Sequence, residues 1–375
     1  MKKAIVAGHI CIDITPIFPA GRNADLSAVL QPGKLINMNG VNIHTGGAVA
    51  NTGLAMKKFG CDVQLLGKIG DDAFGGMVMN VLKESGYDGG MITEKGGRTS
   101  YSVVLAMPGI DRIFLHDPGA NNTFCADDVK EEYLQDAALF HFGYPPLMKR
   151  MFEDEGAETL RLMKKVKAHG LATSLDMVAV DPSSEAGQQD WRKIIEKVIP
   201  YVDFFVPSVE ELCFMLDRDR YESWAKRAAG GDITMVLDPQ QDIKPLADDL
   251  IGMGAKAVLI KSGAPGMYYR TAGREVLSQV GERAELDAAA WAGLEGFERS
   301  FIPEKVLSGT GAGDTCIAAF LTSMLQGFGP QRCLQLASAA GTSCVESYDA
   351  LGGLKSFDEM EARIDAGWEK QSFRN

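Results

Sequence analysis

Short apolar runs alternate with segments of helical periodicity along most of the chain. The apolar runs predict buried β-strands, because they are brief, rich in β-branched and aromatic residues, and often end at Gly, Pro or Asp. They are Ile5–Gly8, Val63–Gly67, Leu139–Phe142, Ala172–Asp176, Asp203–Val206 and Ala257–Lys261. Helices are predicted between them, over Ala48–Phe59, Phe74–Ser85, Leu147–His169, Trp191–Ile199 and Leu246–Met253. Doubly buried strands separated by helices predict an α/β fold, a three-layer α/β/α domain with a mostly parallel central sheet.

Ligands of such domains bind at the carboxyl ends of the strands. Asp13, Pro207–Glu211 and Lys261–Gly263 each follow a predicted strand. We therefore expect these three places to face the same edge of the sheet.

Two segments interrupt the alternation and predict a small β-strand lid. Residues 13–45 are rich in Gly, Pro and Asn, and Thr99–Leu105 with Arg112–His116 predicts a hairpin joined by residues 107–111. We expect one domain over residues 1–375, with lid segments at about 13–45 and 98–117. A lid of this kind would exclude water from the site beneath it.

The segment Gly273–Glu304 is less regular and suggests helical stretches around Ala284–Leu294. No function follows from its residues.

Composition narrows the class of protein. A net charge of −12 over 375 residues argues against binding to nucleic acid or anionic membranes, which requires basic surfaces. No run of about 18 apolar residues is present, and Met1–Gly8 predicts a first strand and not a signal peptide. The seven cysteines form no C-x-x-C pair, which is typical of reduced core thiols. Cytoplasm is the expected location.

Ser308–Asp314 is the most informative stretch of the chain. Its small residues run directly into an apolar helical segment, Thr315–Leu325, so that helical N–H groups and the positive dipole end can hold a phosphate. Asp314 is a carboxylate inside a site for anions. Its most direct use is to take a proton from a group that attacks the phosphate, which indicates a kinase.

Gly46 and Gly47 open a second helix, with Asn51 one turn further on. The glycines would let substrate hydroxyls reach backbone N–H groups, although a simple loop-to-helix junction has the same sequence. Asp13 could accept two hydroxyl hydrogen bonds from a sugar, but taken alone it is more readily a solvated loop residue or a helix cap.

Other phosphate and catalytic motifs are not matched. Gly309–Asp314 reads G-x-G-x-G-D, and neither the dinucleotide fingerprint, a P-loop nor a G-x-S-x-G elbow is found in the sequence. The five histidines have no metal-ligand spacing.

Two motifs in the expected order resemble those of the ribokinase/pfkB carbohydrate kinase family. Gly46-Gly47-x-x-x-Asn51 resembles its first signature, and Thr310–Asp314 resembles the end of its second, D-T-x-G-A-G-D. Lys261-x-Gly263-x-x-Gly266 lies in the nucleotide half, and the resemblance covers nearly the whole chain.

The resemblance implies an ATP-dependent kinase that phosphorylates a hydroxymethyl group of a sugar. It implies Asp314 as the catalytic base and the backbone of Gly311, Ala312 and Gly313 as the anion hole. The implied sugar-binding residues are Asp13, Gly46, Gly47 and Asn51. The implied ATP-binding residues are Ser208, Glu211, Lys261, Gly263, Gly266 and Ser338, with Glu211 also acting indirectly on Mg²⁺.

The chain departs from the family pattern at three positions. Ser308 and Gly309 replace the usual Asp-Thr, and Ser208 replaces the Asn of N-x-x-E. These changes leave the base and the anion hole in place but put metal positioning and rate in doubt.

The resemblance leaves the substrate open. No evident cluster of basic residues is present in the sugar half, and Arg98 and Arg112 belong to the expected lid, so a neutral ribose- or fructose-like sugar is favoured over a sugar phosphate. A nucleoside kinase of the same family is the alternative enzyme, and a non-catalytic sugar- or nucleotide-binding regulatory protein is the alternative from another class. ATP and Mg²⁺ are the expected cofactors. A monovalent cation such as K⁺ near residues 350–353 and a homodimer through the lid are further expectations.

Overall fold

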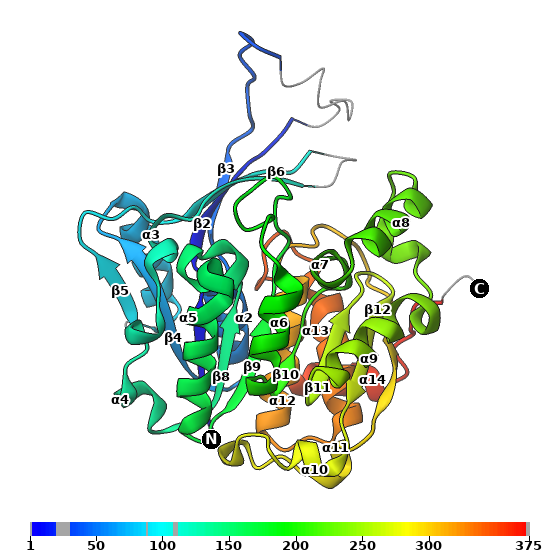
Figure 1. Ribbon diagram of the computed structural model, residues 1–375. Coiled ribbons are helices and arrows are strands. Elements are labelled where there is room, and N and C mark those ends of the chain that lie inside the picture. Colours follow the sequence, from blue (N-terminus) through cyan, green and yellow to red (C-terminus); the bar gives the residue numbers. More distant parts are fainter. Residues whose placement is uncertain (1, 20–30, 88, 108–111, 373–375) are drawn as a thin grey trace.

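The computed structural model describes residues 2–19, 31–87, 89–107 and 112–372. A nine-stranded sheet forms its centre (Figure 1). In spatial order the strands are β13 (Glu295–Arg299), β12 (Gly266–Thr271), β11 (Ala257–Lys261), β10 (Phe204–Phe205), β9 (Ala172–Asp176), β8 (Ala137–Gly143), β1 (Lys3–Gly8), β4 (Asp62–Gly70) and β5 (Met91–Glu94). The strands from β11 to β5 are parallel, whereas β12 and β13 are antiparallel.

Helices cover both faces of this sheet. One face carries α2 (Ala48–Lys58), α3 (Ala73–Glu84), α12 (Ala312–Leu325), α13 (Pro330–Cys344) and α14 (Phe357–Asp365). The other carries α5 (Lys149–Ala168), α6 (Trp191–Val198), α7 (Val209–Leu216), α8 (Arg218–Ala228) and α9 (Lys244–Gly252). Short α4 (Glu131–Leu134) precedes β8. The three-layer α/β/α fold expected from the sequence is confirmed.

The alternation along β1 shows why apolar strands required two helical layers. Ala4 and Val6 lie in the hydrophobic cluster of the α2 face, and Ile5 and Ala7 lie in that of the α5 face. Successive side chains of a strand point to opposite faces, so a strand with no polar face must be covered on both sides.

A second, four-stranded sheet supplies the expected lid strands. Its order is β3 (Val41–Gly46), β2 (Cys11–Pro16), β6 (Tyr101–Leu105) and β7 (Ile113–Asp117). The predicted hairpin is present, because β6 and β7 pair antiparallel. Its connection at 108–111, and residues 20–30 of the first lid segment, lie outside the described residues. Figure 1 shows this sheet projecting from the end of the molecule opposite to α10 (Arg274–Leu277) and α11 (Ala288–Trp291).

Three local expectations differ from the structure. Asp13 does not end the first strand but lies within β2, where it pairs with His44 of β3. The Ala284–Leu294 stretch contains one helical turn, α11, and the segment continues into edge strand β13. The long helix α5 is interrupted at Glu153–Gly156, where three residues have positive φ.

Within the described residues, no helix is long and apolar enough to cross a membrane.

Candidate active site

The strand order places a crevice between β1 and β8. The chain leaves β1, builds β4 and β5 on one side, and returns to the other side with β8. Such a switch point opens a crevice at the carboxyl ends of the two strands. His9 follows β1 there and Tyr144 follows β8, and their ring centroids lie 6.1 Å apart.

Asp314 lies in the first turn of α12 at this crevice. Its side chain is buried, with a residue exposure of 5%. Three side chains donate hydrogen bonds to its carboxylate: Asn51 Nδ2 to Oδ2 at 3.0 Å, Thr52 Oγ1 to Oδ1 at 3.1 Å and Tyr144 Oη to Oδ1 at 2.7 Å. Donors that favour the ionised form keep a buried carboxylate able to accept a proton.

Residues 308–313, the loop before Asp314, are called the anion loop below, and glycine shapes this loop. Gly311 caps α12 with φ 77°, a left-handed conformation, and a Cβ there would overlap the side chain of Ala350. Ser308 shapes the same turn, because its Oγ accepts the Thr310 N–H at 3.1 Å and donates to Thr310 Oγ1 at 3.0 Å. The first N–H groups of α12 are the kind that hold an anion.

A buried ion pair adjoins this loop. Lys261 Nζ, at the end of β11, donates to Asp176 Oδ1 at 2.7 Å and to the carbonyl of Val206 at 2.6 Å. The space where a Gly313 Cβ would stand is 3.4 Å from Lys261 Cε, so the ammonium stem lies against the anion loop.

The charged side chains around Lys261 shift one another's pKa values. Burial, with the nearby Glu211 and Asp314, raises the pKa of Asp176 to about 8 against the effect of Lys261. Burial opposes the charge of Lys261, but Asp176, Glu211 and Asp314 together raise its pKa. The ammonium therefore remains charged among three carboxyl groups.

A cavity of about 850 Å³ extends from the anion loop across the ends of β11 and β12. Its size is in the range of small-molecule sites. Seven of the residues expected in the ATP site or anion hole line it: Ser208, Lys261, Gly263, Gly266, Ala312, Gly313 and Ser338.

Two of the residues expected to bind ATP make hydrogen bonds within the protein. Glu211 does not line the cavity, and its Oε2 accepts the Ser208 N–H at 3.0 Å across the first turn of α7. Ser338 Oγ donates to the carbonyl of Arg299 at 3.1 Å.

The expected sugar-binding residues lie where the second sheet meets α2: Asp13 in β2, Gly46 at the end of β3, and Gly47 and Asn51 at the start of α2. Gly46 and Asp13 approach so closely that a Cβ on Gly46 would stand 2.7 Å from Asp13 Oδ1. Gly47 has φ 85°, and its Cβ would stand 2.6 Å from His9 Nδ1. Burial raises the pKa of the Asp13 carboxyl, against hydrogen bonds from Cys11 and Ser102 that lower it.

His9 presents a bare acceptor in this region. Ser100 Oγ donates its single proton to the carbonyl of Asp117 at 2.7 Å, so the 3.3 Å contact with His9 Nε2 requires the imidazole to donate. Nδ1 is then unprotonated, and it is buried without a partner among the described residues. Burial and the neighbouring His116 lower the pKa of His9, which keeps the ring neutral.

Sequence reasoning missed Thr52, Tyr144, Asp176 and His9. The rule that polar residues at carboxyl strand ends face the ligand could have found Tyr144, Asp176 and His9, because each follows or ends a predicted strand. Thr52 had no signal beyond its place beside Asn51.

Arg112 was predicted on the lid, and the structure gives it a contact with the anion loop. Its guanidinium donates to Thr310 Oγ1, and the side chain lines the cavity together with Gly309. It lies on the nucleotide side and not beside Asp13.

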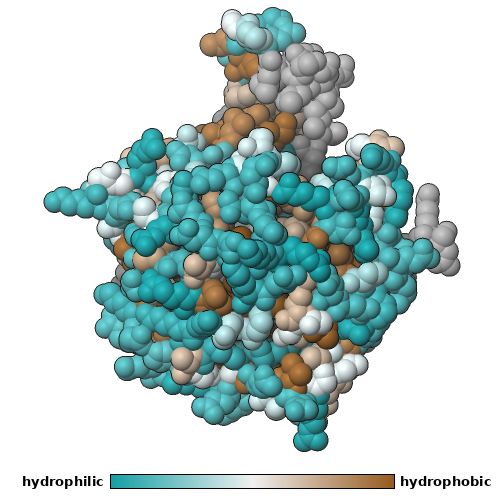
Figure 2. Space-filling view, viewed as in Figure 1, coloured by the Kyte–Doolittle hydropathy of each residue, from teal (hydrophilic) through white to brown (hydrophobic). Residues whose placement is uncertain are grey.

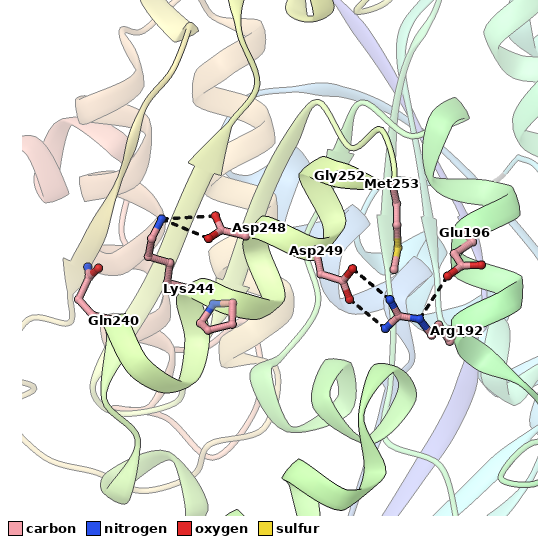
Figure 3. Close-up of a pocket in the computed structure, with 9 residues that line it drawn as sticks. Arg192, Glu196, Gln240, Lys244, Asp248, Asp249, Gly252 and Met253 are labelled. Atoms are coloured by element: carbon pink, nitrogen blue, oxygen red, sulfur yellow. Dashed lines mark hydrogen bonds and ion pairs between the residues drawn. The ribbon is translucent and has the colours of Figure 1, made fainter.

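A second, open hollow lies on the outer surface between α6 and α9 (Figure 3). Its charges are matched: Arg192 pairs with Asp249 and Glu196, and Lys244 pairs with Asp248. None of the expected site residues lines it.

Comparison with known proteins identifies the family of this chain. The model of the pfkB family carbohydrate kinases matches residues 1–355. An uncharacterized sugar kinase of Archaeoglobus fulgidus is 22% identical over 304 residues, 80% of this chain and 98% of its own length. Fructokinase-1 of Zea mays is 32% identical over 221 residues, 57% of this chain and 62% of its own.

Solved structures share the fold. A putative ribokinase II from E. coli, in complex with ATP and Mg²⁺, superposes with a TM-score of 0.70 at 22% identity, covering 98% of this chain and 100% of that one. Arabidopsis thaliana ribokinase complexed with ribose and ATP gives 0.69 at 19% identity, with 96% and 98% covered. The chain belongs to the pfkB family of carbohydrate kinases.

Proposed function

We propose that this kinase transfers the γ-phosphate of ATP to a hydroxymethyl group of a neutral sugar of ribose or fructose type. The observation that carries the proposal is the position of Asp314, a buried carboxylate with three donors, directly after an anion loop that borders a nucleotide-sized cavity. Phosphoryl transfer depends mainly on such positioning and on charge stabilisation.

In this proposal ATP occupies the cavity and its γ-phosphate meets the N–H groups of Gly311, Ala312 and Gly313. Asp314 accepts the proton of the sugar hydroxyl as the oxygen attacks phosphorus and ADP leaves. Lys261 adds a positive charge beside Gly313. An ATP complex of the E. coli relative and the ribose–ATP complex of the Arabidopsis relative support this assignment.

Mg²⁺ would accompany the nucleotide. No group of three His, Cys, Asp or Glu side chains in the described ranges is arranged to hold a metal by itself. Asp176, Glu211 and Asp314 nevertheless bring carboxyl oxygens together around Lys261, and oxygen-rich surroundings suit Mg²⁺. Glu211 would act on the ion indirectly, and Mg²⁺ would neutralise charge on the phosphates.

A neutral sugar fits the groups where the second sheet meets α2. Asp13 and His9 Nδ1 are acceptors for hydroxyl protons, with Gly46, Gly47 and Asn51 beside them. Arg112 contacts Thr310 and so does not provide a phosphate site next to Asp13. The names of the fructokinase and ribokinase relatives support the same substrate class.

The lid carries two further proposals. The single domain would close over the sugar by movement of the second sheet, strands β3, β2, β6 and β7. Val41, Ile43, Phe114 and Leu115 expose apolar side chains on this sheet, and Figure 2 shows hydrophobic surface gathered at its base, so a second copy of the chain could pack there as a homodimer. An expected K⁺ site at residues 350–353 must compete with Lys58, whose ammonium already contacts the carbonyl of Leu351 at 2.8 Å.

The test is ADP release from ATP–Mg²⁺ with a panel of sugars, sugar phosphates and nucleosides. We expect a signal with a pentose or ketohexose that falls about 10²- to 10⁴-fold in Asp314→Asn, because a general base contributes on that order. ATP binding should persist in the variant. Asp190→Asn, which alters a helix cap far from the cavity, is the matched control.

Wild-type turnover in Asp314→Asn would contradict the assignment of the base. Preference for nucleosides would favour the alternative enzyme, and ATP binding with no turnover on any substrate would favour a binding protein.

A further inference from the structure

Tyr144 is a buried residue in an unusual backbone conformation. It follows β8 with φ 68° and ψ 44°, the left-handed region that bulky residues rarely adopt. Two prolines follow it, and its N–H donates to the carbonyl of Asp176 at 3.2 Å. Strained backbone of this kind persists only where the surroundings enforce it, and it concentrates at functional sites.

The conformation sends the side chain from β8 toward the first turn of α12. Tyr144 Oη donates to Asp314 Oδ1 at 2.7 Å, which is shorter than the bonds from Asn51 and Thr52. Burial and the nearby Asp314 raise the pKa of the Tyr144 phenol, so it stays protonated and can only donate to the carboxylate.

The three donors are distributed unequally over the two carboxylate oxygens of Asp314. Oδ1 accepts from both Thr52 and Tyr144, which occupies its two lone-pair directions. Among the described residues, the side-chain donor to Oδ2 is Asn51. One lone pair of Oδ2 is thus left for a substrate proton.

We propose that Tyr144 is a positioning residue for phosphoryl transfer, whose hydroxyl fixes Oδ1 of Asp314 so that Oδ2 receives the proton of the sugar hydroxyl. The backbone bond to Asp176 anchors Tyr144 to the strand that also holds Lys261 through its carboxylate. Tyr144 therefore connects Asp314 with the Asp176–Lys261 pair beside the anion loop. The inference rests on Asp314 being the base.

Tyr144→Phe tests the role, because it removes one oxygen and keeps the ring. We expect kcat to fall about 10- to 100-fold, the effect of losing one hydrogen bond to a charged group. The KM for ATP should change less than about 2-fold, since the ATP cavity is untouched. The low-pH limb of the kcat/KM profile should move to higher pH, because Asp314 loses one donor to its ionised form.

Tyr268→Phe is the matched control. Tyr268 also donates a buried hydroxyl to a carboxylate, Glu295 Oε1 at 2.8 Å, but in β12. We expect it to lower thermal stability without moving the pH profile. In the Asp314→Asn background, Tyr144→Phe should cost less than about 2-fold, because the two residues act as one unit.

A Tyr144→Phe enzyme with an unmoved pH profile and a kcat like that of Tyr268→Phe would overturn the inference. If Tyr144→Phe does not fold, Thr52→Val removes the other donor to Oδ1, and an unmoved profile there would overturn it as well. Wild-type turnover in Asp314→Asn would instead refute the proposed function. Failure of the proposed function can therefore be distinguished from failure of the inference on Tyr144.

Discussion

At the scale of single residues, the site depends on polar side chains that pack directly against glycine. Asp13 lies against Gly46, where any Cβ would stand within 2.7 Å of its Oδ1. The carboxylate also accepts a bond from Cys11 Sγ at 3.3 Å. Burial of a carboxylate is unfavourable unless donors surround it, and sugar hydroxyls would add donors to those of Cys11 and Ser102.

Replacing Asp13 by alanine should separate sugar binding from nucleotide binding. We expect the KM for the sugar to rise about 10- to 100-fold, the cost of two hydroxyl bonds to a charged acceptor, with the KM for ATP unchanged. Steady-state kinetics with each substrate varied in turn checks this. A change confined to the KM for ATP would place the sugar elsewhere.

At the scale of elements, the segment Gly273–Glu304 ties together the amino-terminal ends of several strands. Arg283 donates to the carbonyls of Leu134 at 2.8 Å and Gln135 at 2.6 Å, just before β8. The Gly281 N–H donates to buried Asp203, and Trp291 packs edge-on against Phe320 of α12. This end lies opposite the second sheet in Figure 1, so the segment stabilises the fold away from the candidate site.

Arg283→Met should therefore lower the free energy of unfolding by about 1–3 kcal/mol, because the carbonyls of Leu134 and Gln135 lose a charged donor. Turnover of the folded enzyme should stay at the wild-type value. Urea unfolding and kinetics on the same preparation measure both quantities. Arg274→Met, at an exposed position of the same segment, should change neither, and a loss of kcat in Arg283→Met alone would contradict a purely structural role.

The elements also show which features could be predicted from the sequence. Apolar runs and helical periodicity identified the parallel strands except β5, together with helices such as α2, α3, α5, α6 and α9, because burial on both faces leaves a direct trace in residue type. Asp314 and its loop were predicted because glycine and carboxylate occur together at a helix start.

The contacts of Tyr144 could not be predicted, since they depend on a left-handed backbone at a non-glycine residue and on a bond that spans 170 positions. Edge strand β13 was missed because its sequence, Glu-Gly-Phe-Glu-Arg, is mostly polar. Its place at the sheet edge explains that composition.

At the scale of the whole molecule, burial of neutral histidines makes stability depend on pH. Burial lowers the pKa of His141 to about 3, and it also lowers the pKa of His9 and His116. In the unfolded chain each imidazole takes up a proton near its ordinary pKa of about 6.5. The unfolded state therefore binds more protons below that pH, and the folded state loses stability as the pH falls.

For His141 alone, we expect the free energy of unfolding to be about 2 kcal/mol lower at pH 5 than at pH 7. His141→Asn should reduce the difference between the two pH values by that amount, because asparagine does not titrate. Urea titrations of both proteins at the two pH values test this. Equal pH dependence in wild type and variant would show that His141 is protonated in the folded state.

The seven cysteines have a practical consequence at the same scale. All are buried and unpaired, and for six of them, Cys125 apart, burial raises the pKa of the thiol. Thiol reagents attack exposed thiolates, so the native thiols should react slowly. A single cysteine introduced on the outer face of the second sheet would then be the fastest-reacting thiol of the molecule. A fluorophore could be attached there without first removing the native cysteines, and its emission would follow the second sheet as substrates bind.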